Sequence, residues 1–116
     1  IGKFIATVKK SVEDNMDNPS FNVDVLCNLL NMSRTSFYNK IKALTDQAPA
    51  DYIRLIRLKH AAQLLKEQKH TITEISELTG FSDAKYFREV FKKHFNMSPS
   101  QYAKRGKEGK DDKEIK

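Results

Sequence analysis

Residues 22–52 and residues 71–102 of this 116-residue chain are two degenerate copies of one pattern. The offset between the copies is 49 residues, and it becomes 50 because one residue is inserted after Phe81. The aligned pairs are Asn22/Thr71, Val23/Ile72, Leu26/Ile75, Leu29/Leu78, Asn31/Gly80, Met32/Phe81, Phe37/Phe87, Ile41/Phe91, Asp46/Asn96, Pro49/Pro99 and Tyr52/Tyr102. The apolar spacing predicts that each copy is a short helix, a tight turn and a second helix.

The turn of each copy falls on a residue that readily adopts the left-handed conformation, Asn31 in the first and Gly80 in the second. An apolar residue and then a serine follow in both copies. This pattern is typical of a helix-turn-helix unit, whose second helix can enter the major groove of DNA. A single such pattern is weak evidence, but two copies in register are much stronger. The alternative is a helical bundle with a duplicated hairpin and no role in DNA binding.

The whole sequence predicts an all-α fold of about seven helices, and no segment has convincing strand periodicity. A first helix ends at Asn18 and Pro19. The first helix-turn-helix unit then covers about residues 22–45, a long connecting helix about 49–68, the second unit about 71–96, and a last helix about 99–105. We expect these elements to form a domain over residues 1–105, and the charged residues 106–116 to be a disordered tail.

Helix caps and buried positions follow from the same pattern. The predicted N-caps are Asn22, Ser33, Thr71 in a capping box with Glu74, and either Ser82 or Asp83. The positions predicted to be buried include Val23, Leu26, Leu29, Leu30, Phe37, Ile41 and Leu44 in the first copy, and Ile72, Ile75, Leu78, Phe87, Val90, Phe91 and Phe95 in the second. Cys27 aligns with Ser76, so we expect it to be a small buried helix residue.

The second helix of each copy, here called the reading helix, carries polar side chains opposite its apolar face. A helical wheel at about 100° per residue places the exposed residues of the two copies at the same angles. The candidate DNA-binding residues are Arg34, Thr35, Tyr38, Asn39 and Lys42 in the first copy, and Ser82, Lys85, Arg88, Glu89 and Lys92 in the second. These residue types can contact base edges, because Arg and Lys donate to guanine, Asn pairs with adenine, Glu accepts from cytosine and Thr contacts the thymine methyl.

The candidates differ in how well they support base contacts. Arg88 is the best single candidate, whereas Arg34, nearer the flank, suits a phosphate better. For Lys42, Lys92 and Glu89 taken singly, an ordinary solvent-exposed face is an equally good interpretation.

The connecting helix of about 20 residues would be about 30 Å long, close to the 34 Å turn of B-DNA. The sequence therefore predicts two reading helices in successive major grooves.

The net charge of +6 and the pI near 9.4 are compatible with a polyanionic partner. The excess lies in residues 49–70 and in the tail from residue 103. Two further functions therefore stay open: non-specific nucleic-acid binding through these two segments, or a protein-interaction module whose charge serves solubility. An enzyme is the weakest hypothesis, because no serine or cysteine nucleophile and no P-loop spacing is recognisable.

Neither a cofactor nor a metal is predicted. The histidines, His60, His70 and His94, lack metal-ligand spacing.

The lone Cys27 cannot form an internal disulfide, and the sequence has no signal peptide and no membrane span. These features together predict a cytoplasmic protein without membrane contact. Because the first residue is Ile1, we expect the chain to be a piece of a longer protein or a processed product.

Several stretches resemble the DNA-binding domain of the AraC-type bacterial transcription regulators. The second unit matches over Ile72–Ile75, Gly80–Ser82, Tyr86–Phe95 and Met97–Tyr102, and the first over Met32–Tyr38 and Lys40–Thr45. The resemblance covers about residues 4–105 and implies seven helices, sequence-specific binding of promoter DNA, and activation of transcription. Base contacts would come from Arg34, Thr35, Tyr38 and Asn39, and from Lys85, Arg88 and Glu89.

The resemblance also implies partners and a wider context. The partners would be double-stranded promoter DNA and RNA polymerase, and a homodimer would form through regions missing here. The first copy is most similar to regulators from Bacteroidetes, in which such domains form the C-terminal output of hybrid two-component regulators.

Three positions depart from the family. Asp46 and Asn96 stand where the family commonly has glycine, but both residue types tolerate a left-handed backbone. Glu89 stands where the family often has arginine, so its carboxylate would either favour cytosine or steer Arg88 through a salt bridge.

Overall fold

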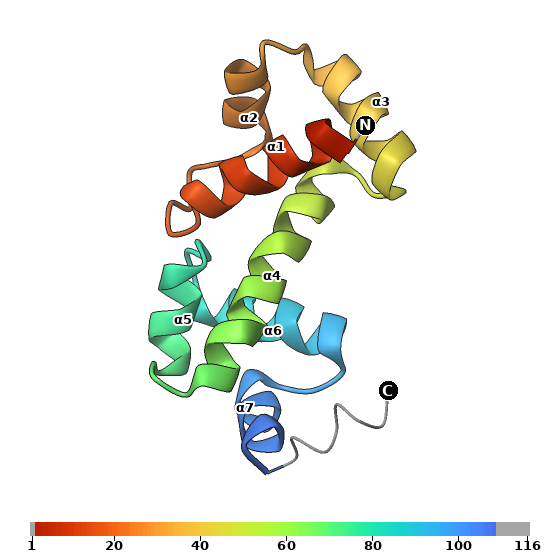
Figure 1. Ribbon diagram of the computed structural model, residues 1–116. Coiled ribbons are helices and arrows are strands. Elements are labelled where there is room, and N and C mark those ends of the chain that lie inside the picture. The colour runs from red at the N-terminus through yellow and green to blue at the C-terminus, as the bar shows by residue number, and fades with distance from the viewer. Residues whose placement is uncertain (1, 109–116) are drawn as a thin grey trace. The chain divides into compact units, whose positions relative to one another are not determined.

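The computed structural model describes residues 2–108 of the chain (Figure 1). Its helices begin and end at residues whose side chains or backbone conformations favour a helix terminus. The elements in this range are α1 (Gly2–Asp14), α2 (Val23–Leu30), α3 (Arg34–Thr45), α4 (Pro49–Glu67), α5 (Ile72–Leu78), α6 (Ala84–Phe95) and α7 (Pro99–Glu108). No strand occurs among these residues, so the predicted all-α fold of seven helices is confirmed. Helix α7 continues to Glu108, three residues beyond the predicted end, and the rest of the predicted tail lies outside the described residues.

The chain divides into two compact units, and the division falls inside α4, between Arg57 and Leu58. The N-terminal unit contains α1, α2, α3 and the first half of α4, and the C-terminal unit contains the second half of α4 with α5, α6 and α7 (Figure 1). Helix α4 supplies Ile53 and Ile56 to the first core and Leu58, Ala61 and Leu65 to the second. Its apolar residues are spread around the helix because they serve two separate cores.

The core of the N-terminal unit joins α1 to the first helix-turn-helix pair. Val8 and Val12 of α1 are fully buried, as are Leu26 of α2 and Ile41 of α3. The ring of Phe37 lies edge-on to that of Phe4, with centroids 6.1 Å apart. This core fixes α3 by its apolar side and leaves the opposite side of the helix to solvent.

A chain of aromatic rings forms the core of the C-terminal unit. The ring centroids of Phe87 and Phe81 are 5.1 Å apart, and those of Phe87 and Phe91 are 5.7 Å apart. Phe91 also contacts Phe95 and Tyr102, with centroids at 4.4 and 5.4 Å. Since Tyr102 lies on α7, these contacts hold the last helix against the reading helix α6.

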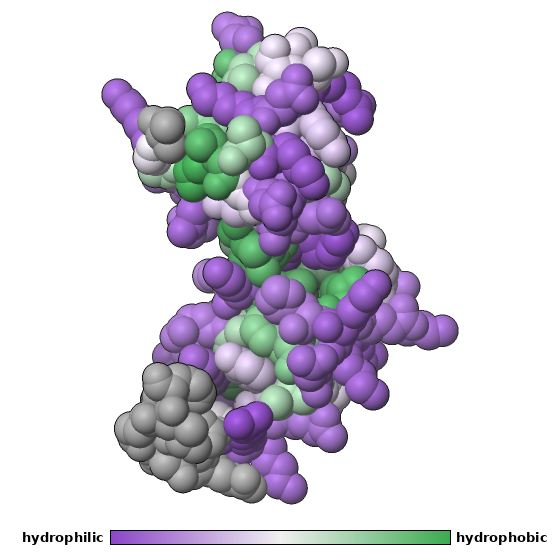
Figure 2. All heavy atoms as spheres, turned by 90° about the vertical axis from the view of Figure 1, so that its right-hand side faces the viewer, coloured by the Kyte–Doolittle hydropathy of each residue, from purple (hydrophilic) through white to green (hydrophobic). Residues whose placement is uncertain are grey.

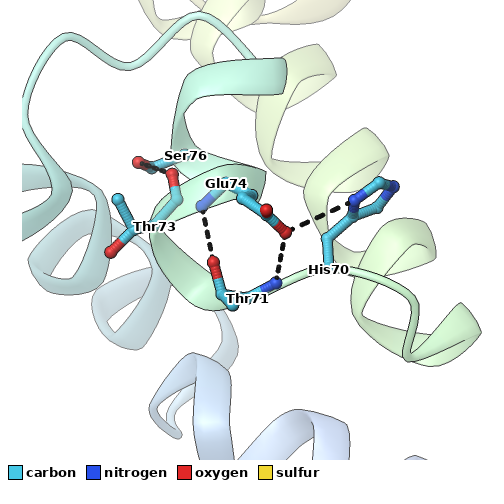
Figure 3. Close-up of polar contacts among 5 residues, drawn as sticks. All are labelled: His70, Thr71, Thr73, Glu74 and Ser76. Carbon is cyan, nitrogen blue, oxygen red and sulfur yellow. Dashed lines mark hydrogen bonds and ion pairs between the residues drawn. The ribbon is translucent and has the colours of Figure 1, made fainter.

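The predicted caps are present. The side chains of Asn22 and Ser33 accept hydrogen bonds from the backbone N–H of Val25 and Ser36, at 3.1 and 3.0 Å. In the capping box of α5, Glu74 N–H donates to Thr71 Oγ1 at 3.0 Å, and Thr71 N–H donates to Glu74 Oε1 at 2.9 Å (Figure 3).

At α6 the structure selects Asp83 from the two predicted caps, since Asp83 Oδ1 accepts from Lys85 N–H at 2.9 Å. A second reciprocal pair joins Ser98 and Gln101 at the start of α7. Each of these bonds satisfies a backbone donor that the helix itself leaves free.

Leu29 and Leu78 were predicted to be buried, and this is wrong. Leu29 is 61% exposed and Leu78 is 38% exposed. The reason is the same in both copies: the buried arc of the helix runs from Leu26 to Cys27 in α2 and from the aligned Ile75 to Ser76 in α5. Leu29 and Leu78 lie about 60° outside that arc, on its far side.

The segment between α1 and α2 is held by a buried guanidinium. Arg57 is 5% exposed, and it donates to the backbone carbonyls of Met16 at 2.6 Å and of Asn18 and Phe21 at 3.1 Å each. Burial lowers the pKa of Arg57. The guanidinium of Arg57 thus donates to three carbonyls of the segment that joins α1 to α2.

Replacing Phe91 with alanine should lower the free energy of unfolding by about 3–5 kcal/mol, because a fully buried ring leaves a cavity among its aromatic neighbours. Urea denaturation followed by circular dichroism measures this. The matched control in the same unit is Leu78→Ala, which should cost about 1 kcal/mol because that side chain is already partly in water. Equal losses for the two variants would contradict the packing described above.

Arg57→Leu should cost at least about 2 kcal/mol, because it removes the guanidinium that donates to the carbonyls of Met16 and Phe21 and shares that of Asn18 with the Phe21 N–H. Arg54→Leu on the same helix is the control, since Arg54 is paired only with the exposed Asp51 and should cost less than about 1 kcal/mol. Thermal unfolding of both variants makes the comparison. If Arg57→Leu were as stable as Arg54→Leu, the guanidinium would have no structural role.

Candidate nucleic-acid interface

The two turns that present the reading helices are built from the same hydrogen bonds. In the first, Asn31 N–H donates to Asn28 O at 3.2 Å and Met32 N–H to Cys27 O at 3.0 Å. In the second, Gly80 N–H donates to Glu77 O at 3.1 Å and Phe81 N–H to Ser76 O at 2.9 Å. Each bond of the second turn joins residues that lie 49 positions after those joined in the first turn. The duplicated helix-turn-helix pattern is therefore present in the backbone as well as in the sequence.

Positive φ angles make these turns possible. Asn31 has φ 59° and Gly80 has φ 82°, as the sequence predicts. Asp46 and Asn96, which end the two reading helices, have φ 61° and 63°, so the departure from glycine leaves the left-handed conformation intact.

A small side chain lies under each turn. Cys27 and Ser76 are 3% and 1% exposed, which confirms that the two aligned residues are buried. Burial raises the pKa of the Cys27 thiol, the nearby Asp24 raises it further, and Arg34 opposes this shift. Cys27 is therefore an uncharged packing residue under the turn.

Helix α3 presents all of its predicted DNA-binding residues to solvent. These residues are Arg34, Thr35, Tyr38, Asn39 and Lys42. The first four line one shallow surface hollow, and Tyr38 is 46% exposed although it is aromatic. A hollow lined by an aromatic ring and by side chains that can form hydrogen bonds is suited to the edge of a nucleobase.

Arg34 has a partner that the sequence pattern did not predict. Its Nη1 lies 2.7 Å from Oδ1 of Asp24, in the first turn of α2, and both side chains are largely exposed. The pair bridges the two helices of the first unit across the turn. An exposed pair of this kind adds little stability, but it gives the guanidinium a preferred direction.

Helix α6 and the turn before it present the second set of candidates. Ser82, Lys85, Arg88, Glu89 and Lys92 are all exposed. Asp83 is the N-cap of α6, so the Ser82 hydroxyl does not cap this helix. Within residues 2–108, Arg88 and Glu89 make no ion pair with each other, so a carboxylate that steers Arg88 is not the arrangement of this structure.

Hydrophilic residues cover most of the face of each unit that Figure 2 shows. The last turn of α6 carries Lys93 next to Lys92, so positive charge continues one residue beyond the predicted DNA-binding positions. Lys40 of α3 lies 4.5 Å from the ring centroid of Phe4. Charge in these places suits the phosphate backbone that flanks a groove.

Two further kinds of site, a metal centre and a membrane span, concern the described part of the chain. That part contains no group of three or more His, Cys, Asp or Glu side chains arranged to hold a metal ion. None of its helices is both long and apolar enough to cross a membrane.

The chain matches a known family and curated relatives. A family described as a helix-turn-helix domain matches residues 26–105. The chain is 50% identical over 96 residues to "Histidine kinase P4" of Formosa agariphila, covering 83% of this chain and 7% of that protein. It is 34% identical over 101 residues to the "Msm operon regulatory protein" of Streptococcus mutans, covering 87% of this chain and 36% of that protein. The chain thus spans only a small part of either relative.

A solved structure has the same fold. The C-terminal domain of the two-component response regulator yesN from Fusobacterium nucleatum superposes with a TM-score of 0.79 at 27% identity. The match covers 87% of this chain and 98% of that domain. The seven-helix architecture with two helix-turn-helix pairs is therefore shared with a domain of a two-component regulator.

The turn before α3 gives a test of the left-handed constraint. Asn31→Ala should lower the free energy of unfolding by about 1 kcal/mol, because alanine adopts positive φ at a steric cost. Asn31→Gly should be neutral or slightly stabilising at the same position. Urea denaturation of the two variants and the unsubstituted chain measures the difference. Equal stability of the two variants would show that the backbone at residue 31 is not held left-handed.

Proposed function

Because this chain belongs to the helix-turn-helix domain family of AraC-type transcription regulators, we propose that it binds promoter DNA sequence-specifically through α3 and α6. Domains of this family bind DNA and regulate transcription. The observation that carries the proposal is the exposure of both reading faces on turns with the same hydrogen-bond register. Each reading helix is fixed by its apolar side, so its polar side is free to contact base edges in a major groove.

Helix α4 contributes residues to both units. It is one continuous helix of 19 residues, or about 29 Å at 1.5 Å per residue. This length is close to one turn of B-DNA, about 34 Å. We expect the preferred DNA site to contain two short blocks, one for each reading helix.

The whole protein is proposed to be a regulator in which this chain is the output domain of a two-component system. Support comes from the strong similarity to part of a protein named as a histidine kinase and from the fold shared with a response-regulator domain. The same proposal includes activation of transcription through contact with RNA polymerase. It also includes a homodimer formed by regions outside this chain, and a cytoplasmic location.

Selection from random duplex DNA at about 100 mM salt tests the proposal, and a binding assay on the selected site then tests single residues. Arg88→Ala should weaken binding to the selected site by about 1–3 kcal/mol more than binding to random DNA, because it removes a base contact. Fluorescence anisotropy with both duplexes measures the two losses.

The matched control is Lys93→Ala in the same helix, which removes an exposed cation at the flank. It should weaken binding equally on both duplexes and reduce the salt dependence by about one charge. Equal losses for Arg88→Ala would make Arg88 a phosphate contact. No salt-dependent binding of the unsubstituted chain to any duplex would overturn the DNA-binding function and favour a protein-interaction module.

A further inference from the structure

The two reading helices begin with the same cap geometry, but they carry different side chains at three matching exposed positions. Both sets of side chains project from helices that begin one residue after an equivalent cap, Ser33 or Asp83. The aligned exposed residues are Thr35/Lys85, Tyr38/Arg88 and Asn39/Glu89. At these three positions a neutral side chain in α3 is replaced by a charged side chain in α6, whereas Arg34 at the start of α3 aligns with Ala84.

The α3 set matches an A·T pair. The carboxamide of Asn39 can pair with N6 and N7 of adenine, and the methyl group of Thr35 can contact the methyl of thymine. Tyr38 adds an exposed ring to the same hollow, which gives the thymine methyl an apolar surface. None of these three side chains offers the two parallel donors that distinguish guanine.

The cations of α3 do not supply a guanine contact in this arrangement. The guanidinium of Arg34 is directed to Asp24, with 2.7 Å between Nη1 and Oδ1, so its bidentate fork is already partly engaged. Lys42 lies in the last turn of α3, whereas base edges are contacted by the N-terminal residues of a reading helix. Lys42 therefore suits a phosphate.

The α6 set matches a G·C pair. Arg88 and Lys85 donate to O6 and N7 of guanine, and the carboxylate of Glu89 accepts from the amino group of cytosine. Among the side chains of residues 2–106, no ion pair engages these three. A carboxylate facing DNA is repelled by the phosphates unless it finds a donor, so Glu89 discriminates strongly between bases.

We propose that the two halves of this domain recognise DNA of opposite base composition, with α3 selecting a block rich in A·T pairs and α6 a block rich in G·C pairs. This inference rests on the proposed function, because it assigns a base preference to the same two helices. It goes further in making the duplicated units functionally unequal, although their turns and caps are equivalent.

The test is selection from random duplex DNA with the 116-residue chain and with two exchanged-face variants. The first variant carries Thr35→Lys, Tyr38→Arg and Asn39→Glu, and the second carries Lys85→Thr, Arg88→Tyr and Glu89→Asn. All six positions are exposed, so both variants should fold, which circular dichroism checks. The unsubstituted chain should select one A·T block and one G·C block. Replacing one pair inside either block by the opposite type should weaken binding about tenfold.

The first variant should select two G·C blocks and the second two A·T blocks, since each exchange converts one half of the site. Asp24→Ala is an independent variant that releases Arg34, and it should introduce guanine at the edge of the A·T block. Asp24→Glu, which keeps the carboxylate, should leave the selected site unchanged.

Two results would overturn the inference while the proposed function stands. One is selection of two blocks of the same composition by the unsubstituted chain. The other is an A·T block that persists in the first variant, because its composition would then reflect DNA shape rather than contacts from α3. Absence of binding to every duplex would instead overturn the proposed function itself.

Discussion

The backbone conformation at the helix ends is the constraint on which the rest of this structure depends. Between α2 and α7, each connection contains one residue with positive φ, and these residues are Asn31, Asp46, Gln68, Gly80 and Asn96. A single left-handed residue ends a helix and lets the chain leave at a fixed angle. The connection between α1 and α2 has no such residue, and there the buried guanidinium of Arg57 holds three loop carbonyls instead.

This constraint separates the parts of the molecule that hold its shape from those that contact a partner. The turns use backbone hydrogen bonds, the caps use Ser33 and Asp83, and the cores use Phe37 and Phe87, which are almost fully buried. The exposed faces of α3 and α6 contribute to none of these. Substitutions on those faces can therefore change which DNA is bound while the helix keeps its place.

Much of the fold could be predicted from the sequence because its determinants are local. The caps at Asn22 and Thr71 and the left-handed turn at Asn31 depend on residues within a few positions of one another. The exposure of the reading faces followed from helical periodicity. Leu29 was assigned wrongly because periodicity places it beside Leu26, whereas the position of the neighbouring helices decides which side of Leu26 is covered.

The interactions that the sequence could not predict join residues that are distant along the chain. Arg57 reaches Met16 across 41 positions, and Gln68 Nε2 donates to Ala103 O across 35 positions. The pair of Asp24 and Arg34 spans only ten positions, but it depends on how the turn orients α2 against α3.

That pair has a consequence beyond stability. In an exposed ion pair the Coulomb gain is small, so Asp24 contributes little to folding, yet it can compete with a base or a phosphate for the same guanidinium. The second unit has Thr73 and Ala84 at the aligned positions and therefore lacks such a competitor. Asp24 thus engages the guanidinium of Arg34 at a position where the second unit, with Ala84, has no guanidinium.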